Sequence, residues 1–212
     1  MNEEIIFEKN RKYSEKFLQP LGPPKLPKYL NQILNKEKPK SFIDLGCGDG
    51  IIISGVKKEF PKIKITGIDI SPRRINGLKE RFPKDNFYIK DVCNTQLKNK
   101  FDFVYSSQVI ENVPSDKKMI KEINRILSKN GTVFVSSVIK TGPMVYKYRN
   151  KGKFVLDPTH EREYLNAAEF LNLFKKNFRL IKFWVEPVRR RIFRMEVKIP
   201  RYFLIYGFWK KR

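Results

Sequence analysis

The stretch Asp44-Leu45-Gly46-Cys47-Gly48-Asp49-Gly50 follows a compact apolar run that begins at Ser41. The run has the composition of a β-strand, and a helix is expected from about Ile51 to Phe60, where Pro61 ends it. Glycine lets the backbone adopt positive φ and approach a ligand closely. The free N–H groups at the start of the following helix favour a negatively charged group. The stretch therefore predicts a strand, a tight turn and a helix that together hold a ligand.

Strand-type and helical segments alternate on both sides of this turn. Apolar runs at 62–70, 86–90, 101–106 and 132–139 predict four more strands. Ser71-Pro72 opens one intervening helix, Ser115 caps another that runs to about Ser128, and Asn130-Gly131 is interpreted as its stop. Such alternation is typical of an α/β fold with a parallel sheet and helices on both faces. Two late strands, at 178–186 and 201–209, add an antiparallel hairpin and make seven strands.

The segments outside the alternating region are a helical start and a long connection. Helices are predicted at 4–18, 26–34 and 166–176. The 140–165 segment is too long for a minimal connector, and long loops at the carboxyl end of a sheet commonly recognise substrates. We expect one domain over 1–212. Its parts are a helical cap at 1–39, a cofactor-binding core at 40–139, and a substrate loop with the C-terminal strands at 140–212.

An acid at the end of the second predicted strand narrows the choice of ligand. Asp69 stands 21 positions after Gly48, where a carboxylate can accept hydrogen bonds from both hydroxyls of a ribose. A nicotinamide dinucleotide site is the competing interpretation, since Gly46 and Gly48 match the first two glycines of G-x-G-x-x-G. Position 51 is isoleucine, and the missing third glycine counts against a dinucleotide.

Five motifs follow one another along the chain: DLGCGDG at 44–50, GIDIS at 67–71, Asp91-Val92, FDFVYSSQVIENV at 101–113 and LSKNGT at 127–132. In order and spacing they resemble those of class I S-adenosylmethionine-dependent methyltransferases of the small-molecule type, related to the quinone-biosynthesis group. The resemblance covers residues 41–139. It implies a Rossmann-like, mostly parallel seven-stranded sheet, with S-adenosyl-L-methionine as the cofactor.

The resemblance also implies a role for each position. The backbone of the glycine turn would hold the methionine part of the cofactor, with Asp44 beside its amino group. Asp69 would bind the ribose hydroxyls, and Ile70 would pack on adenine. Asp91 would accept a hydrogen bond from the adenine amino group, and the Val92 N–H would donate one to the adenine ring. The expected cofactor-binding residues are Asp44, Gly46, Cys47, Gly48, Gly50, Asp69, Ile70, Asp91, Val92, Ser107 and Gln108. No metal ligands are expected, and Tyr13 is assigned to core packing, with closure over the cofactor as the alternative.

The acceptor side of the site is less well marked. His160, the one histidine, follows the fifth predicted strand. Histidine titrates near neutral pH and can take a proton from a hydroxyl, so His160 is the candidate catalytic base, with a structural histidine as the alternative. Glu111, Tyr146 and Arg162 are the candidate substrate residues, and the sequence leaves open whether Arg162 faces an acidic substrate or Glu111. Gln108 stands near a position where the family commonly has histidine.

The net charge and the length of the apolar runs limit which partners and which cellular location are expected. Forty-five Lys and Arg against 22 acids give a net charge of +23. This favours RNA or an anionic surface bound through the basic region at 186–212, and solvated lysines are the alternative. The longest apolar run, 202–209, is far shorter than the roughly 20 residues of a transmembrane helix. With two cysteines and no signal-peptide pattern, we expect a cytoplasmic protein, with peripheral membrane attachment as the alternative.

Three functions are compatible with these features. The first is O-methylation of a small or lipid-linked hydroxylated acceptor, which His160 and the family resemblance favour. The second is an RNA or protein methyltransferase, which the charge favours. The third is a non-catalytic basic binding module on the same fold, and the intact cofactor motifs count against it.

Overall fold

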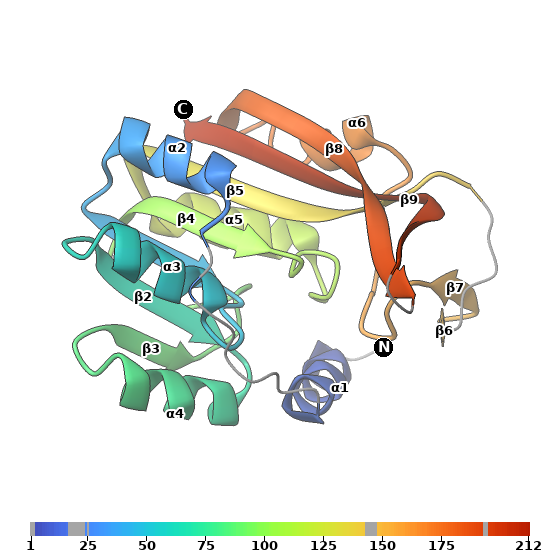
Figure 1. The fold of residues 1–212 in the computed structure, drawn as a ribbon, viewed down its shortest axis with the longest axis horizontal. Coiled ribbons are helices and arrows are strands. Elements are labelled where there is room, and N and C mark those ends of the chain that lie inside the picture. The colour runs from blue at the N-terminus through green and yellow to red at the C-terminus, as the bar shows by residue number, and fades with distance from the viewer. Residues whose placement is uncertain (1–2, 17–23, 25, 143–147, 193–194) are drawn as a thin grey trace.

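A seven-stranded sheet forms the centre of the protein (Figure 1). The computed structural model describes residues 3–16, 24, 26–142, 148–192 and 195–212. The strands of the sheet are β1 (Ser41–Leu45), β2 (Lys64–Asp69), β3 (Asn86–Ile89), β4 (Phe101–Ser107), β5 (Leu127–Lys140), β8 (Phe178–Ile192) and β9 (Met195–Lys211). Their order is β3-β2-β1-β4-β5-β9-β8, and only β9 runs antiparallel to both of its neighbours. The predicted α/β fold, with a mostly parallel sheet and a C-terminal antiparallel hairpin, is confirmed.

Helices cover both faces of this sheet (Figure 1). One face carries α2 (Lys28–Glu37), α3 (Ile51–Glu59) and α4 (Pro72–Arg81), and the other carries α5 (Asp116–Ile126) and α6 (Ala167–Asn172). Leu30, Ile53 and Ile75 bury the first group of helices in one apolar cluster. Ile123 and Phe170 bury the second group in another. The sequence therefore builds two cores, one on each side of the strands.

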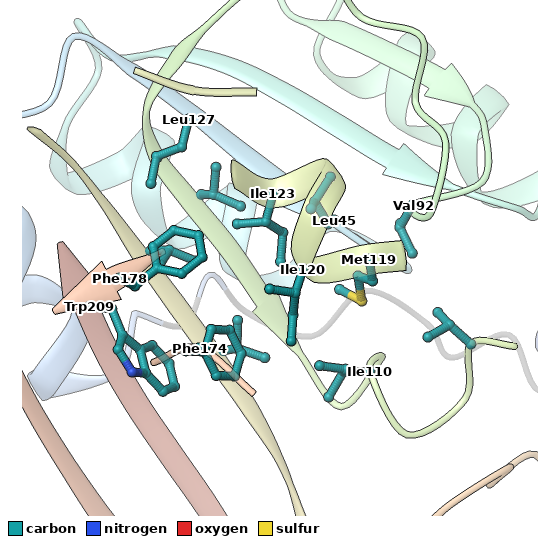
Figure 2. Packing of buried hydrophobic residues seen from close by; sticks show 14 of the residues in the cluster. Leu45, Val92, Ile110, Met119, Ile120, Ile123, Leu127, Phe174, Phe178 and Trp209 are labelled. Atoms are coloured by element: carbon teal, nitrogen blue, oxygen red, sulfur yellow. The ribbon is translucent and has the colours of Figure 1, made fainter. Parts of the chain in front are cut away.

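Aromatic side chains attach the C-terminal hairpin to the second core (Figure 2). Trp209 of β9 is 1% exposed and stacks on Phe174, with ring centroids 4.0 Å apart. Phe178, at the start of β8, packs against the same ring of Phe174. Burying such rings contributes about 1.5–3 kcal/mol each, so the hairpin is an integral part of the core.

The helix before β5 ends earlier than the sequence indicated. Ser115 caps α5 as predicted, accepting from the amide of Lys118, but Asn130-Gly131 is not the helix stop. The backbone is already extended at Leu127 (φ −78°, ψ 133°), which is fully buried and pairs with Phe101 in the sheet. Burial of Leu127 in the sheet therefore sets the end of the helix. Asn130, with φ of 63°, instead lies within β5, at an irregularity where the register with β4 shifts.

The connection after β5 contains more structure than the predicted loop. A second, two-stranded sheet pairs β6 (Tyr148–Asn150) with β7 (Lys153–Val155). An isolated bridge then joins Tyr164 to Ile139 of β5. These pairings return the connection to the carboxyl end of the sheet, where it delivers residues 157–163 to the site.

The basic C-terminus is bonded into the fold. Lys211 donates through Nζ to the carbonyl oxygens of Asn124 (2.5 Å) and Leu127 (2.8 Å), and burial lowers its pKa. Lys210 pairs with Glu37 of α2. These two lysines therefore fasten the end of β9 to α2 and to the junction of α5 and β5. In the described part of the chain, no helix combines the length and the apolar character needed to span a bilayer.

Candidate active site

The glycine turn lies where β1 ends and α3 begins. Gly46 (φ 79°) and Gly50 (φ 75°) both adopt the left-handed conformation that side chains disfavour. A Cβ on Gly46 would lie 2.4 Å from Cγ2 of Val109, and one on Gly50 would lie 2.4 Å from Cδ2 of Leu78. Two elements therefore press against the turn, and only glycine fits at these two positions.

Asp69, at the end of β2, is joined to the turn. Its carboxylate is 6% exposed, and it accepts from the backbone amides of Gly48 and Ser71, each at 2.9 Å. Burial raises the pKa of the Asp69 carboxyl, while these two hydrogen bonds act in the opposite direction. The two bonds fix the carboxylate in a single orientation toward an adjacent cavity.

That cavity, which we call the Asp69 cavity, has a volume of about 340 Å³. It brings together residues from the turn, from β2 and from the ends of β3 and β4. The expected residues that line it are Gly46, Asp69, Ile70, Asp91, Val92, Ser107 and Gln108. The Asp91 carboxylate accepts from the amide of Cys93 at 2.8 Å, so it is held at the rim by its own loop. The cavity thus combines two fixed carboxylates with apolar walls.

A second space, the Asp44 cavity, lies on the other side of the turn and has a volume of about 400 Å³. Asp44 and Cys47 line it together with Gly46. Asp44 is 3% exposed, and burial, together with the nearby charge of Asp69, raises its pKa to about 8. A buried carboxyl with this pKa favours a cationic partner, which would stabilise its ionised form.

A third space, the His160 cavity, has a volume of about 310 Å³. His160 is 6% exposed, and its Nδ1 lies 2.9 Å from Oε1 of Glu163 and 3.5 Å from the hydroxyl of Tyr202. Burial by itself lowers the pKa of His160, but the hydrogen bond to Glu163 and the charge of Glu111 outweigh it, so the pKa is raised. With Nδ1 engaged by Glu163, Nε2 is the nitrogen left to accept a proton.

Glu111 lines the same cavity and is completely buried. Its Oε2 accepts from the Ser137 hydroxyl at 2.9 Å, whereas Oε1 has no hydrogen-bond partner among the described residues. Burial raises the pKa of the Glu111 carboxyl, and the neighbouring His160 acts in the opposite direction. Glu111 therefore presents one unsatisfied acceptor atom near His160.

Gln108 lines all three cavities. Its φ of 59° is rare for a residue with a side chain, and such strain persists where surrounding bonds impose it. The Gln108 amide donates to the Ser136 carbonyl at 3.2 Å, and the Gln108 carbonyl accepts from Nδ2 of Asn112 at 3.0 Å. Gln108 is therefore fixed at the point where the three spaces meet.

The N-terminal helix α1 (Glu3–Lys16) supplies Asn10, which the sequence did not mark, and Tyr13, which was assigned to core packing. Asn10 and Tyr13 line the Asp69 cavity. Asn10 donates to the carbonyl of Asn112 at 2.7 Å, and the Tyr13 hydroxyl donates to Asp157 at 3.2 Å. Tyr13 therefore faces the cavity, as in the alternative interpretation, instead of the core. Arg74, Asn112 and Thr159 also line this cavity and were not predicted.

Arg162 lies outside the lining of the three cavities. Its guanidinium donates to the carbonyls of Ile110 and Pro114, each at 2.8 Å, and approaches Asp116 at 3.8 Å. It thus fastens the loop that carries Glu111 and forms no ion pair with the Glu111 carboxylate. Tyr146, the other expected substrate residue, falls outside the described residues.

Comparison with known proteins identifies the architecture. Residues 15–185 match the family described as methyltransferase domain. A malonyl-[acyl-carrier protein] O-methyltransferase of Ilyobacter polytropus is 26% identical over 68% of this chain and 55% of its own length. A ubiquinone biosynthesis O-methyltransferase of Pelagibacter ubique is 27% identical over 69% of this chain and 65% of its own length. The chain thus spans between half and two thirds of these two relatives.

The fold also matches solved structures over nearly its whole length. An S-adenosylmethionine-dependent methyltransferase from Clostridium acetobutylicum aligns with a TM-score of 0.66 at 14% sequence identity. The alignment covers 96% of this chain and 98% of that protein. At this identity the likeness concerns the fold alone.

Proposed function

The chain belongs to the class I S-adenosylmethionine-dependent methyltransferases, and on that premise we propose that it methylates a hydroxyl group of a small or lipid-linked acceptor. The observation that carries this proposal is the meeting of three cavities at Gln108. One contains carboxylates suited to a nucleoside, one a buried acid suited to an ammonium group, and one a histidine suited to a hydroxyl. We propose the cofactor-binding and catalytic residues on the same ground.

The described residues fit S-adenosyl-L-methionine part by part. Asp69 keeps lone pairs for ribose hydroxyls beyond its two backbone bonds, while Ile70 and Asp91 supply a wall and an acceptor for adenine. Asp44, buried beside the glycine turn, would pair with the methionine ammonium. When bound, the cofactor supplies a methyl group already activated by its sulfonium.

The protein's own contribution is then alignment and exclusion of water. Holding two reactants in line removes much of the entropic barrier to their reaction. Gln108 lies between the cofactor spaces and the His160 cavity. Its constrained backbone therefore fixes how these spaces are placed relative to one another. Asn10 and Tyr13 of α1 form part of the wall of the Asp69 cavity.

His160 would act as the general base for a hydroxyl acceptor. The Glu163 carboxylate accepts from the Nδ1–H group and thereby fixes the tautomer that leaves Nε2 basic. As the oxygen of the acceptor forms its bond to the methyl carbon, its proton passes to Nε2. Glu163 does not contact the acceptor in this arrangement and acts as a positioning residue.

The names of the relatives support oxygen as the methylated atom, since both are O-methyltransferases. One of them acts on a malonyl group, which ends in a carboxylate, so the names alone leave the class of oxygen acceptor open. Neither name points to an RNA acceptor, and two residues of the basic C-terminal region, Lys210 and Lys211, are bonded within the fold.

Calorimetric titration tests the proposed cofactor site. Wild-type protein is expected to bind S-adenosyl-L-homocysteine saturably and to leave NAD unbound. Asp69→Asn should weaken binding of S-adenosyl-L-homocysteine by about tenfold or more, because it removes a charged acceptor of hydrogen bonds. The matched control is Glu59→Gln, which removes an exposed carboxylate at the end of α3. Equal binding by wild type and Asp69→Asn would contradict the proposal.

A further inference from the structure

The His160 cavity is acidic inside a strongly basic protein. Glu111 and Asp157 line it, and Glu163 stands behind His160. Among the residues that the structure describes, no Lys or Arg lines this cavity. The chain nevertheless carries a net charge of +23. The interior of the cavity therefore repels anions although the protein as a whole attracts them.

The two lining carboxylates differ in how they are satisfied. Asp157 accepts from the Thr159 amide at 2.9 Å, from the Thr159 hydroxyl at 2.6 Å and from the Tyr13 hydroxyl at 3.2 Å. Glu111 is completely buried and uses only Oε2, while Oε1 has no partner among the described residues. An unsatisfied buried acceptor is unfavourable, so a bound molecule that brings a donor to Oε1 gains affinity.

The remaining walls of the cavity are partly polar, from Gln108, Asn112 and Thr159, and partly apolar. Val138 of β5, Leu156, Val188 of β8 and Leu204 of β9 line it, and Val138 and Val188 belong to one buried cluster. The C-terminal hairpin thus supplies part of the surface that an acceptor skeleton would contact. The cavity combines this apolar surface with polar side chains, and among them Glu111 has the unsatisfied acceptor and His160 the ring nitrogen that can take a proton.

Building on the proposed function, we infer that the acceptor is an uncharged diol with an apolar portion. One hydroxyl gives its proton to Nε2 of His160, and a second hydroxyl donates to Oε1 of Glu111. In the transfer, the C–S bond to the methyl group breaks, its electron pair stays on sulfur, and the new C–O bond forms at the first hydroxyl. Glu111 and Asp157 exclude acceptors that place a carboxylate in the cavity, such as a malonyl group.

Matched probes test this substrate class in the full chain. Two sets share a skeleton each and differ only in the polar groups. The first comprises 4-butylcatechol, 4-butylphenol and 4-butylbenzoate, and the second comprises octane-1,2-diol, octan-1-ol and 2-hydroxyoctanoate. Binding of each probe is measured by calorimetry on protein saturated with S-adenosyl-L-homocysteine, and methyl transfer by product mass.

We expect the diol of at least one set to bind about tenfold or more tightly than its deoxygenated partner, because the latter leaves Oε1 of Glu111 unsatisfied. The carboxylate probe should bind more weakly still. Equal affinity of diol and single alcohol, tighter binding of the carboxylate, or no binding by either diol would each overturn the inference. Binding of S-adenosyl-L-homocysteine is measured first, so its failure would instead remove the proposed function.

Glu111→Gln locates the effect at this residue. Removing the charge while keeping the shape should raise the affinity for 2-hydroxyoctanoate relative to octane-1,2-diol by about tenfold. Glu59→Gln should leave this ratio unchanged, because Glu59 is exposed on α3, away from the cavity. The melting temperature and the affinity for S-adenosyl-L-homocysteine verify that the variant is folded. An unchanged ratio in folded Glu111→Gln would overturn the role of Glu111.

Discussion

Asp44 makes cofactor binding depend on pH in a way that a single substitution should abolish. The side chain is 3% exposed, and burial, aided by the charge of Asp69, raises its pKa to about 8. If the ammonium of S-adenosyl-L-homocysteine pairs with ionised Asp44, the carboxyl must lose its proton before the ligand binds. The free energy of binding then includes the free energy of that deprotonation.

The magnitude follows from the pKa. A carboxyl with a pKa of about 8 is ionised in about 1% of molecules at pH 6 and in about 10% at pH 7. The affinity should therefore rise about ninefold between these two pH values, while the α-amino group of the ligand, with a pKa of about 8, stays largely protonated. Asp44→Asn should bind more weakly at pH 7 and lose this dependence. Asp69→Asn should keep the dependence but shift it to lower pH, because the Asp69 charge helps to raise the pKa of Asp44.

Calorimetric titration with S-adenosyl-L-homocysteine at pH 6 and pH 7, in buffers of matched ionic strength, measures this change. Glu59→Gln serves as the control and should behave like wild type. Since the pKa of His160 is also raised, by its hydrogen bond to Glu163, the comparison with Asp44→Asn assigns the effect. A wild-type affinity that stays constant between pH 6 and pH 7, or an equal rise in Asp44→Asn, would refute the reasoning.

Three further predictions concern stability and the base. In the absence of ligand, Asp44→Asn should stabilise the protein above pH 8 by up to roughly 5 kcal/mol but not at pH 4, because the raised pKa of the Asp44 carboxyl removes stability as pH increases from 4 to 8. Denaturant unfolding at pH 4 and pH 9 measures this difference. A loss of stability in Asp44→Asn at pH 9 would contradict the prediction. Methyl transfer should increase with pH with an apparent pKa above 6.5. Glu163→Gln should move that pKa downward, since the hydrogen bond that His160 donates to the Glu163 carboxylate raises the pKa of His160. A pH–rate profile unchanged in Glu163→Gln would remove the positioning role. Phe174→Ala should lower the free energy of unfolding by about 3–5 kcal/mol, because the ring is fully buried against Trp209. A loss below about 1 kcal/mol in urea denaturation would show that stacking on Phe174 does not anchor the hairpin.

The core of the fold was predictable because each strand and its following helix carry local signals. The apolar runs, the glycine turn at 46–50 and the serine cap at Ser115 each specify a boundary that packing then respects. The end of α5 was not predictable, since Asn130 lies at a register shift within β5 and the burial of Leu127 decides where the helix ends. The hairpin also runs beyond the predicted strands. Arg189 pairs with Lys198 across a ladder that needs only backbone bonds and no apolar pattern.

The site was predictable to a similar degree and for similar reasons. Residues at strand ends, such as Asp69 and Asp91, carry motif signals, and the structure places both in one cavity. Asn10 carries no signal, because it reaches the cavity only through the tertiary placement of α1. Glu163 was missed although its spacing of three residues from His160 could have suggested a partner. The role of Arg162 depended on backbone carbonyls that a sequence does not locate. The division into a cap at 1–39, a core at 40–139 and a substrate part at 140–212 stays a prediction.

A crystal structure of the chain grown with S-adenosyl-L-homocysteine tests the central claim most directly. We predict that the ribose hydroxyls bond to Asp69, that the amino group lies against Asp44, and that the sulfur lies beside Gln108 and faces His160. The three cavities would then form one continuous cofactor and acceptor site. A ligand bound elsewhere, or one whose sulfur faces away from the His160 cavity, would contradict the proposed active site.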